Sequence, residues 1–157
     1  MDAVSDGELA PDFALSEDGG AEGETLSGLR GRAVVLYFYP KDDTPGCTAE
    51  ARDFSCLMDE FDKAGAHVIG ISPDIVRSHA KFRDKHELKV RLASDSDTAI
   101  ANAYGVWVQK QMYGRTFMGV ERATFLIDQE GRVARIWRTV RVPGHVDEVL
   151  AAVRSLQ

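Results

Sequence analysis

The feature that most constrains the fold is an unbroken apolar run, Ala33-Val-Val-Leu-Tyr-Phe-Tyr39, which ends at Pro40. A run of this length, rich in β-branched and aromatic residues, is typical of a central strand that is covered on both faces. Proline has no amide hydrogen to donate to a sheet, so the strand is expected to end there. The run therefore predicts a buried strand at the centre of the fold.

The segments after this strand alternate between helical and strand-like patterns. We expect helices over 44–64, 75–87, 98–103 and 145–156, the first stopped by Gly65, and strands over 67–72, 90–93, 123–127 and 133–137. Residues 16–31 are interpreted as irregular or hairpin structure and 105–121 as a long loop, while a turn over 128–131 joins the last two strands. Early β-α-β crossovers give parallel strands, and the late hairpin adds an antiparallel pair. The predicted class is therefore α/β, a thioredoxin-like fold with a mixed central sheet flanked by helices.

The length of 157 residues predicts a single domain over 1–157. No apolar run approaches the roughly 20 residues that a membrane span needs, so we expect no membrane partner. The two cysteines, Cys47 and Cys56, form neither a C-x-x-C motif nor a Cys/His cluster with zinc spacing. We therefore expect no metal, no cofactor and no disulfide framework.

The formal net charge is -6, which argues against a nucleic-acid partner. The acidic excess lies at the start, because residues 1–24 carry eight acidic and no basic residues, and the remaining chain is nearly neutral. The N-terminal sequence MDAVSDGELAP has no basic segment followed by an apolar one, as a secretory signal would. We therefore expect a cytoplasmic protein.

The segment Thr44-Pro45-Gly46-Cys47 has the pattern of a helix start that carries a reactive thiol. Threonine is a good N-cap residue, and proline fits the first helical position because its missing N–H costs nothing there. The sulfur of Cys47 then lies near unpaired N–H groups and the positive end of the helix dipole, which favour a thiolate. Gly46 leaves space for a substrate and an N–H that can bind an anion or oxygen. The alternative is that Cys47 is a small residue that fills the start of a helix.

The residues around Cys47 resemble a known family. Pro40-x-x-x-Thr44-x-x-Cys47 matches the peroxiredoxin active-site pattern P-x-x-x-[T/S]-x-x-C. The longer string, FYPKDDTPGCT-x-E over 38–50, resembles the bacterioferritin-comigratory-protein (PrxQ) branch. The resemblance covers nearly the whole chain, with further matching segments at 10–13, 70–72, 104–106, 122–128 and 144–150.

This resemblance implies a thiol-dependent peroxidase. It implies that Cys47 attacks a peroxide and becomes a sulfenic acid, and that the hydroxyl of Thr44 binds the peroxide and the sulfur. It further implies that Pro40 shields the sulfenic acid and that Arg122 directs its guanidinium at the thiolate and the peroxide. Glu50 belongs to the same string and is expected to have a supporting role at best, since an acid early in a helix is favourable anyway. Hydrogen peroxide and small organic hydroperoxides are the expected substrates.

The sequence departs from the family where a second cysteine is expected. Many members of this branch carry a resolving cysteine five residues after the first one, where this chain has Arg52, and others carry it in the helix over 75–87, which has none here. Cys56 lies nine residues after Cys47, about 13.5 Å along a helix, whereas a disulfide needs Cα atoms within about 7 Å. We therefore expect a one-Cys mechanism, recycled by glutathione, glutaredoxin or thioredoxin.

Several alternatives remain open at this stage. Cys56 could resolve the sulfenic acid if the helix unwinds, or it could pair between subunits. The chain could also be a peroxide sensor or redox relay that acts through a partner protein, or a holdase-like protein with an unreactive Cys47. A disulfide oxidoreductase is disfavoured by the missing C-x-x-C. Both a monomer and a homodimer fit the sequence.

Overall fold

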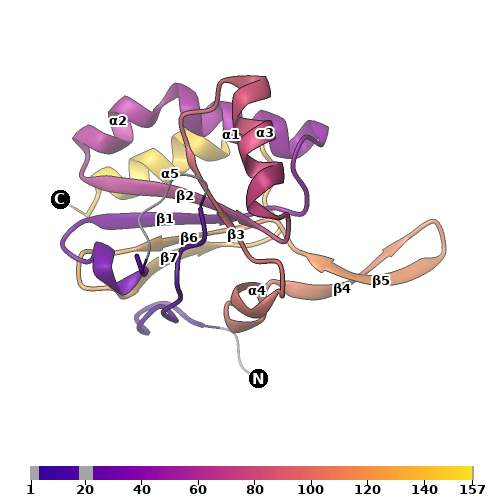
Figure 1. The fold of residues 1–157 in the computed structure, drawn as a ribbon. Coiled ribbons are helices and arrows are strands. Elements are labelled where there is room, and N and C mark those ends of the chain that lie inside the picture. Colours follow the sequence, from indigo (N-terminus) through magenta and orange to yellow (C-terminus); the bar gives the residue numbers. More distant parts are fainter. Residues whose placement is uncertain (1–3, 18–22, 157) are drawn as a thin grey trace.

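The computed structural model describes residues 4–17 and 23–156. Its centre is a five-stranded sheet with the order β3-β2-β1-β6-β7 (Figure 1). The strands are β1 (Ala33–Phe38), β2 (Ala66–Ser72), β3 (Arg91–Ser94), β6 (Ala123–Ile127) and β7 (Val133–Trp137). Strands β1, β2 and β3 pair in parallel, whereas β6 is antiparallel to both of its neighbours. The predicted mixed sheet is confirmed.

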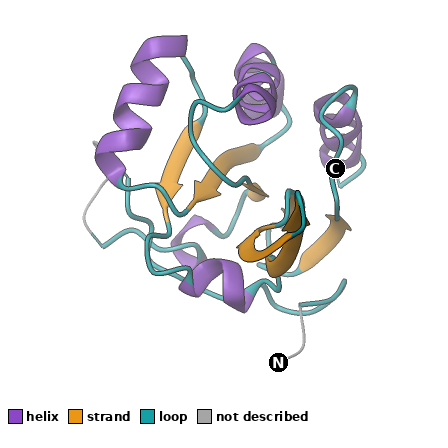
Figure 2. Ribbon diagram, turned by 90° about the vertical axis from the view of Figure 1, so that its right-hand side faces the viewer, coloured by secondary structure: helices purple, strands orange, loops and turns teal. Residues whose placement is uncertain are grey.

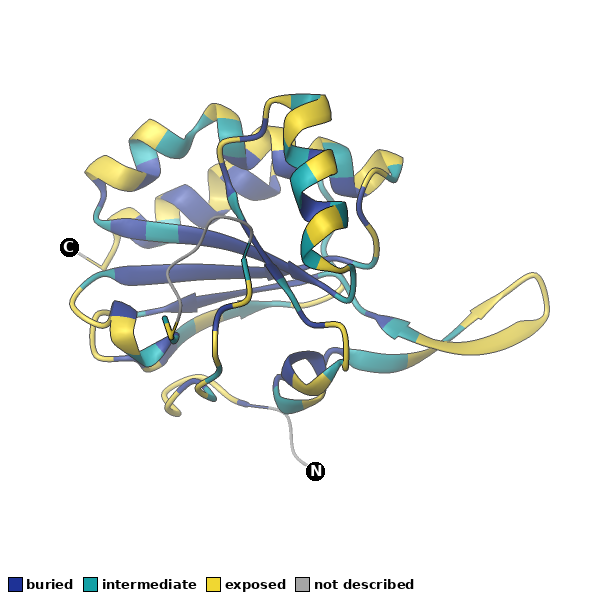
Figure 3. Cartoon of the chain, in the orientation of Figure 1, coloured by how far each residue is buried: buried dark blue, intermediate teal, exposed yellow. Residues whose placement is uncertain are grey.

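Helices cover both faces of the sheet unequally. Four helices lie on one face: α1 (Pro45–Cys56), α2 (Met58–Lys63), α3 (Val76–His86) and α5 (His145–Arg154) (Figure 1). The short helix α4 (Ala99–Ala103) lies on the other face, and residues of the N-terminal segment and the 3-10 turn η1 (Ser27–Leu29) belong to the same core as α4. Each face has its own apolar cluster, so the sheet is the buried layer between two cores (Figure 3).

Strand β1 is buried along its whole length, as the apolar run predicted. Its side chains alternate between the two cores, with Val35 and Tyr37 on the side of α1 and Leu36 and Phe38 on the other. A strand between β2 and β6 has sheet neighbours on both edges and packed cores on both faces. The element that leads to Cys47 is therefore a firmly held support for the loop after it.

The predicted single helix over 44–64 is wrong in one respect, because the structure has two successive helices that are separated at Leu57. Helix α1 ends at Cys56, and Leu57 has φ -106° and ψ 12° before α2 begins at Met58. The amide of Leu57 donates to the carbonyl of Phe54, which is the tighter 3-10 pattern common at helix ends. Leucine is a good helix former, so the local sequence does not predict the interruption at Leu57.

The predicted loop over 105–121 is also wrong, because it contains a β-hairpin. Strands β4 (Trp107–Met112) and β5 (Arg115–Val120) pair with each other in a sheet of their own. Tyr113 and Gly114 both have positive φ, 53° and 75°, as a two-residue hairpin turn requires. The hairpin projects from the body of the molecule (Figures 1 and 2), and its tip is exposed (Figure 3).

The other predicted elements agree with the structure to within about two residues, the usual scatter at element ends. The interpretation of 16–31 is only partly tested, because residues 18–22 lie outside the described part of the chain. Beside that gap, Ala14 and Thr25 form an antiparallel bridge. Among the described residues, no helix is long and apolar enough to cross a bilayer.

Candidate active site

The loop after β1 lies next to the residue before β6, because the end of β1 and the start of β6 meet at the same end of these two central strands. Strand β6 runs antiparallel to β1, with Ala123 opposite Phe38, so the start of β6 lies at the end of β1. Arg122 immediately precedes β6, and the loop to α1 follows β1 directly. The sheet register therefore juxtaposes Arg122 and Cys47, which are 75 positions apart in the sequence.

Cys47 is the third residue of α1, as predicted, and only 2% of its surface is exposed. Thr44 occupies the N-cap position, Pro45 is the first helical residue, and the first helical hydrogen bond runs from the amide of Thr48 to the carbonyl of Thr44. The amides of Gly46 and Cys47 precede that bond and stay available to a ligand. The helix dipole adds positive potential at the same place, which favours a negatively charged sulfur.

Arg122 bridges the sulfur of Cys47 and the carboxyl group of Glu50. Its Nη2 atom lies 3.2 Å from Sγ of Cys47, and its Nη1 atom donates to Oε1 of Glu50 at 2.7 Å. Burial opposes the charge of the guanidinium, but the negative charges of Glu50 and Cys47 outweigh it and raise the pKa of Arg122. The cation is therefore permanent, and its planar fork fixes both partners at once.

Glu50 is fully buried on the inner face of α1. Burial raises its pKa to about 7, although the charge of Arg122 and the hydrogen bond from Arg122 lower it in part. Its second carboxyl oxygen, Oε2, is buried without a hydrogen-bond partner among the described residues. Glu50 thus contacts Arg122 directly, as the supporting role predicted for it requires, and it titrates close to neutral pH.

Thr44 and Pro40 belong to the segment between β1 and α1, and neither is hydrogen-bonded to the sulfur in the described part of the chain. The hydroxyl of Thr44 donates to the carbonyl of Lys41 at 2.8 Å, and its side chain makes no capping bond to α1. The N-cap position is confirmed, whereas the side-chain cap is not formed. With its proton engaged, the oxygen of Thr44 keeps lone pairs that can accept a hydrogen bond from a peroxide. Pro40 is half-buried just beyond the end of β1.

Comparisons with known proteins decide the family. Residues 7–136 match the AhpC/TSA family. The chain belongs to the AhpC/TSA family. Among curated relatives, Peroxiredoxin Bcp of Xanthomonas campestris is 49% identical over 144 residues, covering 92% of this chain and 89% of the relative. Peroxiredoxin Bcp of Bacillus subtilis is 46% identical over 150 residues, covering 96% and 95% of the two chains.

Solved structures agree with this assignment. The bacterioferritin comigratory protein of X. campestris superposes with a TM-score of 0.84 at 48% identity, covering 90% of this chain and 89% of that one. Peroxidoxin BcpB of Mycobacterium tuberculosis gives 0.84 at 35% identity, with 98% and 99% covered. The fold is thus the thioredoxin-like fold of the peroxiredoxins, as predicted, and the protein is a peroxidase enzyme of the Bcp/PrxQ type.

Cys56 of this peroxiredoxin lies at the opposite end of α1 from Cys47. It is the last residue of the helix and is exposed, whereas Cys47 is buried, and both are free thiols. Cys56 opens on a surface hollow of about 320 Å³ between the end of α1 and the start of α5, lined also by Asp53, Leu57, Gly144, Val146 and Asp147. An intact α1 therefore keeps the two sulfurs apart.

Lys110 is a residue near the site that the sequence did not single out. It lies on β4, and its aliphatic stem passes over Gly119 of β5, where a Cβ would be 3.3 Å from Cδ of Lys110. Burial and the positive charge of Arg122 lower the pKa of Lys110, while the negative charge of Cys47 opposes this. The middle of the hairpin thus adds a second positive charge within electrostatic range of the sulfur.

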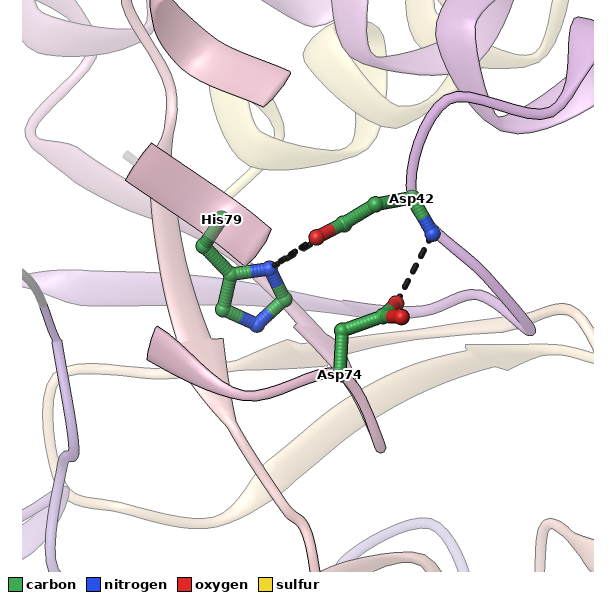
Figure 4. Close-up of side chains that lie close together, drawn as sticks. All are labelled: Asp42, Asp74 and His79. Carbon is green, nitrogen blue, oxygen red and sulfur yellow. Dashed lines mark hydrogen bonds and ion pairs between the residues drawn. The ribbon is translucent and has the colours of Figure 1, made fainter. Parts of the chain in front are cut away.

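A buried polar cluster lies behind the active-site loop. Asp42, Asp74 and His79 offer ligand atoms within 4.8 Å of one another, which is the spacing of a metal site (Figure 4). Their polar atoms are already engaged, however, since Asp42 binds His79 and its amide donates to Asp74. We interpret the cluster as an internal hydrogen-bond network. The sequence analysis missed it because Asp42 and His79 are 37 positions apart and belong to different elements.

Proposed function

We propose that this peroxiredoxin reduces hydrogen peroxide and small organic hydroperoxides through a sulfenic acid on Cys47. The observation that carries the proposal is the 3.2 Å contact between Sγ of Cys47 and the guanidinium of Arg122. The thiolate attacks the terminal oxygen of the hydroperoxide, the O–O bond breaks, and the departing alkoxide or hydroxide takes up one proton. Cysteine sulfenic acid and an alcohol or water are the products.

In this proposal, Arg122 and the amides of Gly46 and Cys47 stabilise the negative charge that moves onto the leaving oxygen, which the contact of Arg122 with the sulfur supports. Thr44 accepts the hydrogen bond of the peroxide O–H, and Pro40 limits access of water to the sulfenic acid. A lowered pKa alone does not make a fast nucleophile, because nucleophilicity falls with basicity. Positioning of the peroxide by these groups supplies most of the acceleration. For organic substrates the proposal draws support from the X. campestris relative, which is described as having alkyl peroxide reduction activity.

We propose a one-Cys cycle for the return of Cys47 to the thiolate. An external thiol condenses with the sulfenic acid, releases water and forms a mixed disulfide, and a second thiol then displaces Cys47. Glutathione, glutaredoxin and thioredoxin are candidate reductants. Resolution by Cys56 is the alternative, and it requires α1 to unwind, since nine helical residues span about 13.5 Å and a disulfide needs Cα atoms within about 7 Å.

The experiment is the intact mass of the reduced protein after one equivalent of hydrogen peroxide at low protein concentration, with Cys56→Ser as the matched variant. A gain of one oxygen that is unchanged in Cys56→Ser supports the one-Cys cycle. A loss of two hydrogens that vanishes in Cys56→Ser would establish resolution within the chain. A doubled mass would place the bond between subunits, and an unreactive protein would refute the peroxidase assignment of Cys47.

A sensor or relay would share the same first step, so the two functions are separated by turnover. We expect continuous peroxide consumption in the presence of a thiol reductant, at a rate that stays proportional to enzyme concentration. A single burst of one equivalent, with every candidate reductant, would favour the relay. The cytoplasmic location, the single-domain organisation and the monomeric or dimeric state remain predictions from the sequence.

A further inference from the structure

Helix α3 binds the loop that joins β1 to α1. The loop residue Asp42 is only 7% exposed, although its neighbours Lys41 and Asp43 are exposed. Its carboxylate accepts hydrogen bonds from the hydroxyl of Tyr39 at 2.7 Å and from the hydroxyl of Ser78, on α3, at 2.8 Å. The side chain of Asp42 is therefore held inward by Tyr39, which directly follows β1, and by Ser78 of α3.

The third partner of Asp42 is His79, whose ring is completely buried (Figure 4). Its Nε2 atom lies 3.1 Å from the carbonyl oxygen of Ala93, which can only accept, so Nε2 carries a proton. Its Nδ1 atom lies 2.8 Å from a carboxylate that already accepts two hydroxyl protons, so a second proton lies between Nδ1 and Asp42. The geometry is that of a buried imidazolium–carboxylate pair.

The loop has a second set of contacts, which are weaker. The amide of Asp42 donates to Asp74 at 2.8 Å, and Asp43 pairs with Lys85 and His86 of α3, both at 2.7 Å. The pair of Asp43 with Lys85 is exposed to solvent, where an ion pair contributes little, and Asp43 is itself exposed in its contact with His86. The buried pair is different, because removing one partner leaves the other charge uncompensated in a low-dielectric interior.

We propose that His79 and Asp42 are positioning residues for the peroxidatic centre. Asp42 is two residues before Thr44 and five before Cys47, and the hydroxyl of Thr44 is itself oriented by the carbonyl of Lys41 in the same loop. Arg122 reaches the sulfur from β6, which is a separate support. The ion pair fixes the loop between β1 and α1. It thereby sets the orientation of Thr44 and the position of Cys47 relative to Arg122. This inference rests on the proposed function of Cys47.

The test compares two reactions of the same sulfur in His79→Asn, in which an amide can still donate to Asp42 but carries no charge. Oxidation of Cys47 by hydrogen peroxide needs Thr44 and Arg122 in place, whereas alkylation by iodoacetamide needs only a thiolate that the reagent can reach. Both rates are measured in a Cys56→Ser background, because Cys56 is the exposed thiol. We expect the peroxide rate constant to fall at least about tenfold, because small misplacements are costly in a preorganised site. The alkylation rate should stay near that of the wild type.

The control is Lys85→Gln, which removes a charge from the same helix at its exposed pair with Asp43 and should change neither rate. Equal loss of both rates in His79→Asn would mean a general structural role and would overturn the proposal, as would an unchanged peroxide rate. If His79→Asn does not fold, Ser78→Ala, which removes one donor to the same carboxylate, should give a smaller loss in the same direction. A wild type that does not react with peroxide would refute the proposed function instead.

The protonation state has its own measurement. Nitrogen-15 spectra of the folded, histidine-labelled enzyme at neutral pH should show one histidine with protons on both ring nitrogens, and this signal should vanish in His79→Asn. A neutral His79 with one bare nitrogen would overturn the ion pair.

Discussion

Gly46 lies against Arg122 so closely that a Cβ at position 46 would be 3.2 Å from Nη2 of the guanidinium. The same nitrogen contacts the sulfur of Cys47. Position 46 therefore needs a glycine for space, because any side chain would push the guanidinium away from the thiolate by a few tenths of an ångström.

The first prediction follows from this contact. Gly46→Ala should fold at least as well as the wild type, because alanine is the better helix former. Its rate constant for Cys47 oxidation should fall about tenfold, because the guanidinium is displaced. Stopped-flow tryptophan fluorescence with excess peroxide measures the rate, and Arg52→Ala, on the exposed side of α1, is the control. An unimpaired Gly46→Ala would mean that the position of Nη2 does not limit the reaction.

The second prediction concerns the planar guanidinium of Arg122, which binds Cys47 and Glu50 at the same time. Lysine keeps the positive charge but has a single ammonium group, which cannot hold Cys47 and Glu50 in the fixed geometry of a guanidinium. Arg122→Lys should therefore react with peroxide on the order of 100-fold more slowly. Arg135→Lys, at an exposed arginine of β7, should be indistinguishable from the wild type. A fast Arg122→Lys would show that charge alone suffices.

The third prediction is a pair of opposite pH dependences of stability. Glu50 has its pKa raised by burial from 4.5 to about 7, so the folded state holds a proton that the unfolded state releases. The free energy of unfolding therefore falls as pH rises from about 4.5 to about 7. Burial lowers the pKa of His145 from 6.5 to about 4, so its contribution is present above pH 6.5 and is lost as pH falls toward 4.

Urea unfolding of the reduced protein between pH 4.5 and 8 checks both signs. Between pH 4.5 and 7 the wild type should lose up to about 3 kcal/mol of its free energy of unfolding because of Glu50, and Glu50→Gln should not show this loss. As the pH falls below 6.5 the wild type should lose a similar amount because of His145, and His145→Gln should not. The Nε2 atom of His145 lies 2.8 Å from the hydroxyl of Thr124, and glutamine can keep that contact. Parallel curves for wild type and Glu50→Gln would mean that Glu50 stays ionised throughout.

The fourth prediction concerns the far end of α1. Phe54 is fully buried and stacks on Tyr37, with ring centroids 4.6 Å apart. Phe54→Ala should cost about 3–5 kcal/mol and should raise amide exchange chiefly over 45–56. Phe82→Ala, at a buried phenylalanine of α3 in the same core, should cost a similar amount while leaving α1 protected. Equal exchange of α1 in the two variants would show that Phe54 does not hold the helix.

The fold was largely predictable because its strongest signals are local. The apolar run from Ala33 ends in a proline, and the cap, proline and glycine before Cys47 mark a helix start without any tertiary information. The hairpin over β4 and β5 was missed because its tip is exposed on both strands, apolar Met112, Phe117 and Met118 included, so no buried face imposes an alternation. Its two-residue turn, Tyr113-Gly114, was the available signal.

The sequence singles out Cys47 and Arg122 as candidate reactive residues, whereas it does not reveal the side chains that hold them in place. Cys47 and Arg122 belong to two sequence segments, 38–50 and 122–128, that match the family. The sheet register brings these two residues together. The contact of Glu50 with Arg122 and the pair of Asp42 with His79 depend on packing between distant elements. A polar residue in a loop and a histidine on a helix face have many ordinary explanations in a sequence, so only the three-dimensional arrangement reveals their pairing.

The interruption at Leu57 and the burial of Cys47 together have a kinetic consequence. Because the helical pattern is broken at Leu57, α1 can open without unwinding α2, although the ring contact between Phe54 and Phe61 would be lost. Because Cys47 is only 2% exposed in the closed helix, we expect opening of α1 to precede reduction of an oxidised Cys47 by a bulky reductant. At high reductant concentration, the regeneration rate should reach a plateau set by the opening of α1, and chemically unrelated thiols should share that same ceiling.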